Sequence, residues 1–560
     1  MAAASRRPKL RADDSAETRA FRDWMLENGV LLDGIDIGID ERDASYRGAV
    51  ATRDLLPGDV VVEVPAASVI TARGDERSGA RGSAPLRNTN TAAMRFAMRR
   101  EMGMSAPRVR REALVRELAY WMLESMEDRG GGGEKTSDGS VDFVGYVRFL
   151  LARSTVEHIV ESSPVFFPKE IYRHSSIDTL MRRSSRPREV PSMLHRCCAI
   201  FVNEMRRRDA AARGDAGDAG DADARLQKRR RSHNRSLIAP AVAKTVSAGA
   251  AVGALGDAAF YELVYKLATA LVAGYSFSLG EGGRYQSMVP AFDVLNHTDD
   301  AECHVALRHD DARDVLQMVM RRPCRRGEEV FNCYGDLSSS ELLWRYAFVP
   351  SPILADGGFR SRHDAVMLDV GLYYRRTHGM DGDGDGQLLN RLRHVRYAND
   401  AEKIDWVFRV GRSGMPLPQL LETVRIVFLP AERRGDHATA EDVPRVLEVI
   451  RSIATWQLRR IGKALEKIGA FVATDAAAGG QGGGGINANC RRKRAHVNGE
   501  PQRGRPSNAN SRPRWNKRMC TLIEAAALVE VLCLERLVHR CDPEKSDLIS
   551  HHRILRGSTL

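Results

Sequence analysis

The chain has 560 residues, which is long for one compact domain, and 43% of them are hydrophobic, so two or three folded units are expected. Lysine and arginine outnumber the acidic residues by 85 to 73, and much of the resulting charge of +12 lies in a few arginine-rich runs rather than along folded faces. The nine cysteines include no C-x-x-C motif, which argues against a disulfide framework and favours a reducing, intracellular compartment. No apolar run has transmembrane length, and the first residues lack the hydrophobic stretch of a secretory signal.

The N-terminal region is predicted to contain a helix followed by a β-hairpin. Phe21, Trp24 and Met25, with Gly29 after them, indicate an amphipathic helix over residues 17–28. Over residues 46–70 the valines alternate and a Pro-Gly pair stands in turn position, which predicts a hairpin.

The middle of the chain has helical periodicity on both sides of a low-complexity stretch. Apolar spacing predicts helices over residues 111–126 and 257–273. Residues 206–235 combine Gly-Asp-Ala repeats with a Lys-Arg run and are expected to be disordered. We interpret that run as a solvated linker in preference to a nuclear-import signal or a nucleic-acid patch.

Two later segments place polar side chains at the ends of apolar runs. Asn296 and His297 end the first run, and Tyr334 and Gly335 end the second. Paired strands are predicted between the two segments, over residues 302–308 and 314–320. A carboxamide and a phenol in such places are expected to be buried and to need hydrogen-bond partners.

These segments resemble the two hallmark motifs of SET-domain methyltransferases, in the branch typified by the Rubisco large-subunit methyltransferase. That branch has D-x-x-N-H, then G-E-x-x-F-x-x-Y-G, then S-N-x-E-L and an aromatic-small-Phe-Val ending. This sequence matches them in register with Asp293-Val294-Leu295-Asn296-His297, Gly327-Glu328 to Tyr334-Gly335, Ser338, Glu341 and Tyr346-Ala347-Phe348.

The resemblance implies an α+β fold, with a SET β core that is split by a helical insertion and followed by a helical substrate-binding-like domain. Apolar spacing supports helices in the last part, over residues 417–429, 444–458 and 521–537. Residues 379–386 and 476–514 are expected to be disordered insertions. The expected parts are 17–95 and 286–350 for the two halves of the SET core, 96–285 for the insertion and 351–560 for the helical domain.

The function implied by the resemblance is protein-lysine N-methylation with S-adenosylmethionine as cofactor, in the nucleus or cytoplasm, with plastid import left open. Histidine methylation within the same family and an inactive SET-like scaffold are the alternatives. Tyr334 is the implied catalytic residue, and Tyr346 and Phe348 would contact the substrate. The residues implied for the cofactor are Ser45, Arg47, Gly48, Asp293, Asn296, His297, Tyr334 and Phe348. The implied partner is a protein substrate, and neither a membrane nor nucleic acid is expected.

Two positions depart from the family pattern. In addition, two groups of possible metal ligands do not fit a metal site. Tyr46 stands where the family has the first of two glycines, and Tyr275 stands where it has a cofactor-binding arginine. The ligand types between His297 and His304 lack the separated pairs of a zinc site. Asp381 to Gly386 resembles the start of a calcium loop, but Leu392 stands where the bidentate glutamate belongs, so no metal is expected.

Overall fold

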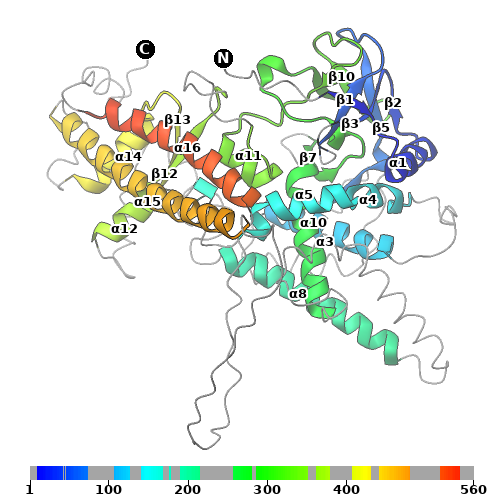
Figure 1. Ribbon diagram of the computed structural model, residues 1–560, viewed down its shortest axis with the longest axis horizontal. Coiled ribbons are helices and arrows are strands. Elements are labelled where there is room, and N and C mark those ends of the chain that lie inside the picture. Colours follow the sequence, from blue (N-terminus) through cyan, green and yellow to red (C-terminus); the bar gives the residue numbers. More distant parts are fainter. Residues whose placement is uncertain are drawn as a thin grey trace, which may run out of the picture.

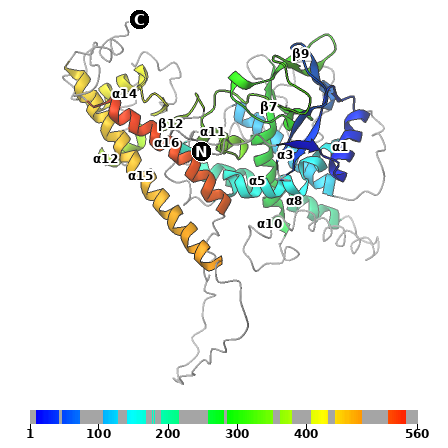
Figure 2. The same cartoon turned by 45° about the horizontal axis from the view of Figure 1, so that its top comes forward.

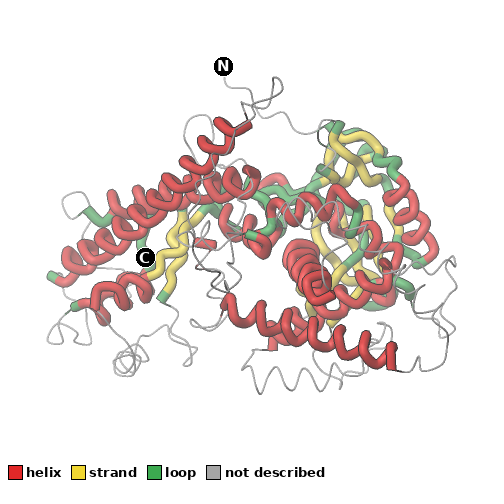
Figure 3. The backbone as a smooth tube through the Cα atoms, turned by 60° about the horizontal axis from the view of Figure 1, so that its bottom comes forward, coloured by secondary structure: helices red, strands yellow, loops and turns green. Residues whose placement is uncertain are grey.

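The computed structural model describes residues 9–41, 43, 46–72, 106–126, 141–167, 176–177, 179, 190–214, 257–280, 285–350, 361–378, 406–429, 441–479 and 517–542. A β-rich part and a helical part lie at opposite ends of the molecule, with long helices between them (Figure 1). Figure 3 shows the strands gathered mainly in the β-rich part, with one further pair inside the helical part. The α+β fold is therefore confirmed.

Three antiparallel sheets build the β-rich part. The first has the order β1-β3-β4-β11, with strands Leu10–Ala12, Ile35–Asp40, Arg47–Ala51 and Glu329–Val330. The second has the order β2-β5-β10-β9, with strands Leu31–Leu32, Val60–Pro65, Val315–Met320 and Val305–Asp310. The third has the order β6-β8-β7, with strands Ile70–Ala72, Tyr285–Met288 and Ser276–Leu279. The predicted pairing of the strands between the two motifs is confirmed, because β9 and β10 are antiparallel neighbours. The sheets begin at Leu10, before the boundary expected at residue 17.

The hairpin predicted over residues 46–70 is wrong. β4 pairs with β3 and β11, whereas β5 pairs with β2 and β10 in another sheet. The intervening chain crosses between the sheets, and the amide of Leu55 donates to the carbonyl of Cys324 at 2.8 Å on the way. The alternation of valines identified a strand but could not identify its partner, which comes from about 250 residues further along the chain.

Helices cover the sheets and fill the insertion. The first is α1, Ala16–Glu27, as predicted, with Ser15 as its N-cap. The others are α3, Ala106–Met126; α4, Val144–Leu150; α5, Arg153–Ser162; α8, Val190–Gly214; and α10, Asp257–Tyr275. α10 packs against α3 and α8, and α1 packs against α4. Phe21 and Trp24 of α1 stack with Tyr146 of α4, so an aromatic cluster joins the N-terminal helix to the insertion.

The expected disorder of residues 206–235 is wrong for its first nine residues. α8 continues to Gly214, and Asp209 accepts a hydrogen bond of 2.7 Å from the hydroxyl of Tyr261 on α10. Alanine and arginine have high helix propensity, so a segment of simple composition extends the preceding helix. Residues 215–235 lie outside the described part of the chain.

The helical part contains α11, Ser339–Tyr346; α12, Val370–His378; α14, Pro418–Phe428; α15, Asp442–Gly479; and α16, Lys517–Arg540. The three helices predicted there are present, although α15 is much longer than residues 444–458 and runs out to residues 476–479 of an expected disordered insertion (Figure 2). The rest of that insertion and residues 379–392 lie outside the described residues. Strands β12, Ala365–Asp369, and β13, Val407–Gly411, form a pair that was not predicted. Short 3-10 turns occupy Ala66–Ser68, Pro164–Phe166, Phe292–Val294 and Asp300–Glu302.

A buried carboxyl links α16 to α11 and to the insertion. Glu530 of α16 accepts hydrogen bonds from the hydroxyl of Ser340 on α11 and from the amide of Ser176. Burial raises the pKa of Glu530 to about 7. Within the described ranges, the structure has no helix that is both long and apolar enough to span a bilayer.

Candidate functional site

The two hallmark segments lie side by side at the edge of the first sheet. The amide of Asn332 donates to the carbonyl of Asn296 at 2.8 Å, and the amide of Thr298 donates to the carbonyl of Asn332 at 2.8 Å. These bonds flank an isolated parallel bridge between His297 and Asn332. Next along the chain, the amide of Tyr334 donates to Nδ1 of His297 at 3.1 Å. Motifs that are more than 30 residues apart in sequence are therefore held in one backbone arrangement.

Asn296 faces the start of β4 through its carboxamide. Its Nδ2 donates to the carbonyl of Arg47 at 2.7 Å and to Oε1 of Glu329 at 2.8 Å. The hydroxyl of Tyr46 donates to the same carboxylate at 3.0 and 3.1 Å. Glu329 is only 8% exposed, so a buried carboxylate lies beside Asn296.

Gly48 leaves the space that this cluster needs. A Cβ atom at Gly48 would lie 2.4 Å from Oε1 of Glu329 and 2.9 Å from Nδ2 of Asn296. Side chains do not approach so closely, so any larger residue would displace one of these groups. The hydroxyl of Tyr46, at the first departure from the family pattern, is used to hold Glu329.

His297 is neutral in this setting. Burial lowers the pKa of its imidazole to about 4, although nearby Asp299 opposes the shift. Its ring centroid lies 5.1 Å from that of Tyr334 and 6.0 Å from that of Phe348. The imidazole therefore adds an uncharged aromatic surface next to the Asn296 cluster.

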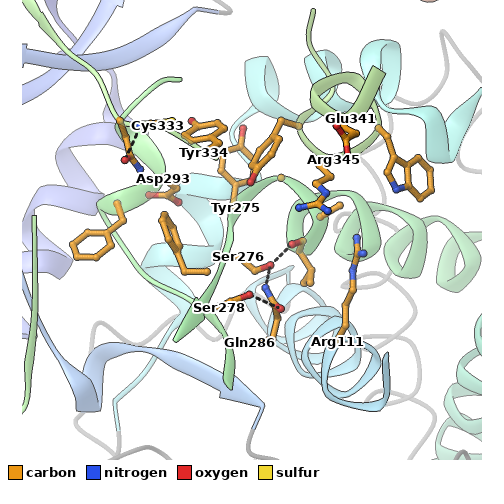
Figure 4. Close-up of a pocket in the computed structure, with 18 of the residues that line it drawn as sticks. Arg111, Tyr275, Ser276, Ser278, Gln286, Asp293, Cys333, Tyr334, Glu341 and Arg345 are labelled. Carbon is orange, nitrogen blue, oxygen red and sulfur yellow. Dashed lines mark hydrogen bonds between the residues drawn. The ribbon is translucent and has the colours of Figure 1, made fainter. Parts of the chain in front are cut away.

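A cavity of about 680 Å³ opens on the other side of Tyr334 (Figure 4). Its walls come from the end of α10 and β7, from both hallmark segments, and from α3 and α11. Residues with polar or aromatic side chains dominate the lining: Arg111, Tyr275, Ser276, Phe277, Ser278, Gln286, Phe292, Asp293, Asn332, Cys333, Tyr334, Glu341, Trp344, Arg345 and Tyr346. Tyr334 belongs to this cavity and also contacts His297, so it stands between the cavity and the Asn296 cluster.

Two phenols of the cavity wall, Tyr334 and Tyr346, are in close contact with each other. The ring centroids of Tyr334 and Tyr346 lie 4.4 Å apart. The hydroxyl of Tyr334 donates to the carbonyl of Leu295 at 2.8 Å, which fixes its direction. Burial raises the pKa of Tyr334 well above its ordinary value, and burial also raises that of Tyr346. Both phenols therefore remain protonated and act as hydrogen-bonding groups rather than as bases.

Asp293 faces this cavity. Its Oδ2 accepts a hydrogen bond of 3.0 Å from Tyr146 of α4, and its buried Oδ1 accepts none from the residues that the structure describes. Burial raises its pKa to about 7, against the effects of Tyr146 and Arg47. Asp293, which the resemblance implied for the cofactor, thus lines the cavity with one carboxyl oxygen that accepts no hydrogen bond from the described residues.

Ala347 sets the direction of the residues on either side of it. It ends α11 with a φ of 62°, in the left-handed region that disfavours side chains, so the chain turns sharply between Tyr346 and Phe348. Tyr346 consequently faces Tyr334 in the cavity, whereas Phe348 lies against His297.

Most of the residues expected at the site come together in this way, and Ser45 lies outside the described residues. Tyr275 lines the cavity with its pKa raised to about 12 by burial and by Asp293. Sequence reasoning missed Glu329, Tyr146 and the cavity arginines Arg111 and Arg345. Only Glu329 had a visible sign, because it follows directly after the motif glutamate Glu328 and ends up buried in a strand. No cluster of three or more potential metal ligands occurs in the part of the chain that the structure describes.

The comparisons with known proteins agree with this geometry. The sequence matches the SET domain over residues 46–335, which is more than half of the chain. Human N-lysine methyltransferase SETD6 is 33% identical over 214 residues, covering 35% of this chain and 43% of the relative. The rat protein of that name is 26% identical over 183 residues, with 31% and 36% coverage. Yeast ribosomal lysine N-methyltransferase 4 (Saccharomyces cerevisiae) is 41% identical over 70 residues, with 12% and 14% coverage. The matches thus span less than half the length of each of these relatives.

The fold has a solved counterpart. The crystal structure of the SET domain of LSMT bound to lysine and AdoHcy superposes with a TM-score of 0.51 at 13% identity, covering 96% of this chain and 93% of that one. This likeness shows the fold, and the SET match over more than half of the chain, which includes both parts of the split β core and the helical insertion, shows the family. The chain belongs to the SET-domain family.

Proposed function

We propose that this protein is an S-adenosylmethionine-dependent protein-lysine N-methyltransferase. The observation that carries the proposal is the position of Tyr334. Its backbone amide is bound to His297 beside the Asn296 cluster, and its ring faces Tyr346 in the cavity. Similarity to relatives named as N-lysine and ribosomal lysine methyltransferases supports the same activity.

The Asn296 cluster fits the proposed cofactor. S-adenosylmethionine carries an ammonium and a sulfonium, and the buried carboxylate of Glu329 is a suitable counter-charge. Gly48 lets a ligand approach the start of β4, where a Cβ would collide with Glu329. The neutral imidazole of His297 avoids placing a further cation beside the sulfonium. Arg47, Asn296 and Phe348 complete the proposed cofactor set, while Asp293 is reassigned to the acceptor side.

The cavity fits a lysine side chain. Aromatic rings from Tyr275, Tyr334 and Tyr346 suit a long aliphatic chain that ends in an amine. Methylation requires the neutral amine, and the free oxygen of Asp293, with a pKa of about 7, is placed to accept a proton from the entering ammonium. The Tyr334–Tyr346 contact leaves little width for an imidazole, so lysine is favoured over histidine.

The chemistry asked of the protein is mainly positioning. When bound, S-adenosylmethionine supplies a methyl group on sulfur, and the C–S bond breaks as the acceptor N–C bond forms. Tyr334 orients the amine in line with that methyl group through its fixed hydroxyl, and Tyr346 limits the sideways movement of the amine. The product methylammonium keeps the positive charge, and the proton that Asp293 took from the entering ammonium passes to water.

We further propose that residues 351–560 dock the protein substrate and that the activity takes place in the nucleus or cytoplasm. The test is transfer of a labelled methyl group from S-adenosylmethionine to proteins of a native extract. Wild-type protein should label discrete bands and Tyr334→Phe should not, while both bind S-adenosylhomocysteine equally in calorimetry. Absence of cofactor binding by the wild type would support the inactive-scaffold alternative.

A further inference from the structure

Two arginines line the acceptor cavity at the end away from Asp293. Arg111 comes from α3 and Arg345 from the last turn of α11, and Figure 4 shows their guanidinium groups extending into the same space. Arg111 is half-buried and Arg345 is exposed at the rim. Neither side chain forms a hydrogen bond or an ion pair with any residue that the structure describes.

The nearby carboxylates are engaged elsewhere. Glu112, next to Arg111, pairs with Arg116 at 3.1 Å and accepts a hydrogen bond from Tyr265. Glu341, one turn before Arg345, accepts from the amide and hydroxyl of Ser338 at 2.9 Å in a capping box and lies 3.4 Å from Arg409. Among the described residues, therefore, no carboxylate forms an ion pair with either of these two neighbouring like charges.

The charge of Arg111 is disfavoured in this arrangement. Burial, followed by repulsion from Arg345, lowers the pKa of its guanidinium, and Glu112 only partly opposes the shift. Like charges gathered at a half-buried site are unfavourable unless an anion joins them. The planar fork of arginine matches a carboxylate better than any other side chain does.

The position of Arg111 and Arg345 indicates which molecule would bring a carboxylate to them. Both guanidinium groups act on the titration of Tyr346, the residue that we place on the acceptor side. Arg47 instead adjoins the Asn296 cluster, because its carbonyl accepts from Asn296, and its charge acts on Tyr275. A carboxylate bound by Arg111 and Arg345 would thus enter with the acceptor rather than with the cofactor.

We infer that Arg111 and Arg345 form an anionic subsite that binds an Asp or Glu side chain of the protein substrate close in sequence to the methylated lysine. This inference rests on the proposed function and gives it a substrate class, namely lysines with an acidic neighbour. The two arginines are specificity residues, since they do not contact the reacting atoms.

The experiment uses the full chain and peptides with one central lysine. Glutamate is placed in turn at each of about three positions on either side, within reach of an extended chain, and each peptide has a glutamine twin. One or two positions should favour glutamate by about ten-fold in kcat/KM, mainly through KM, as expected for a charge-assisted hydrogen bond. Arg345→Gln should abolish the preference, so that each glutamate peptide and its glutamine twin have equal kcat/KM. Arg345→Lys should keep part of the preference, and Arg345→Glu should favour lysine over glutamate at that position.

The controls separate the competing explanations. Arg326→Gln removes an exposed arginine of the same SET core outside the cavity and should leave the preference intact. Arg111→Gln should act like Arg345→Gln, and the rim position of Arg345 keeps the test valid if the Arg111 variant fails to fold. Weaker S-adenosylhomocysteine binding in Arg345→Gln with an unchanged peptide preference would assign the anion to the cofactor and overturn the inference.

Binding gives a second readout that does not depend on turnover. The same peptides are titrated into protein saturated with S-adenosylhomocysteine. Equal affinity for glutamate and glutamine peptides at every position would overturn the subsite. If the protein fails to bind S-adenosylhomocysteine at all, the proposed function fails, whereas a glutamate preference in peptide binding would still support the subsite.

Discussion

Gly48→Ala is the substitution whose consequence the structure defines most closely. The new Cβ would lie 2.4 Å from Oε1 and 3.1 Å from Cδ of Glu329, and 2.9 Å from Nδ2 of Asn296. The atoms in the way belong to the ends of side chains, so they can rotate aside and the protein should still fold. What is lost is the hydrogen bond of 2.8 Å between Asn296 and the Glu329 carboxylate.

The expected size of the effect follows from that bond. A hydrogen bond to a charged group contributes about 1.5–3 kcal/mol, so the free energy of unfolding should fall by up to about 2 kcal/mol. If the same cluster holds the cofactor, affinity for S-adenosylhomocysteine should fall by about ten-fold or more, since each 1.4 kcal/mol changes a binding constant ten-fold.

Calorimetric titration and denaturant unfolding of the same samples would measure both effects. Gly462→Ala is the matched control, because a Cβ there meets no atom within 4 Å and should at most stabilise α15. Unchanged cofactor affinity in Gly48→Ala, with normal folding, would refute the assignment of the Asn296 cluster to the cofactor.

Three other outcomes are expected. Ala347→Gly should raise the free energy of unfolding by about 1 kcal/mol in chemical denaturation, because Ala347 has a φ of 62°, and a loss of stability would contradict the strain. Asp293 has a raised pKa in the folded state, so its protonation contributes to the free energy of unfolding. The contribution is complete below the pKa that Asp293 has in the unfolded chain, and it is lost as the pH rises through about 7. Asp293→Asn should therefore gain stability relative to wild type between about pH 4 and 7 and should flatten the rise of turnover near pH 7; parallel pH profiles would count against both statements. Deleting residues 215–235 should preserve folding and methyl transfer, whereas deleting 206–235 should destabilise the protein by removing the Asp209–Tyr261 bond, and equal behaviour of the two deletions would be the contrary result.

The sequence predicted features that depend on local pattern. Apolar spacing located α1 and α10, and alternation located β9 and β10, because these elements bury one face that the sequence displays directly. The motif register also predicted two neighbouring segments, and backbone hydrogen bonds hold the segments of Asn296 and Tyr334 side by side.

Features that depend on distant partners were not predictable from one sequence. β5 pairs with β10 rather than with β4, and nothing in its alternating valines encodes that choice. Tyr146 reaches Asp293 across 147 residues, and Tyr46 reaches Glu329 across 283. Such contacts exist only once the fold brings the segments together, which is also why the arginine pair went unnoticed.

The central claim is that the cavity accepts a lysine side chain and that Tyr334 aligns it. Site-localised mass spectrometry of the product formed by the full chain with S-adenosylmethionine tests this most directly, with Tyr334→Phe and Tyr346→Phe compared at equal cofactor saturation. We predict methyl groups on lysine, a sharp fall of turnover in Tyr334→Phe, and an altered rate or number of methyl groups in Tyr346→Phe. Methyl groups on histidine, or full activity in Tyr334→Phe, would contradict it.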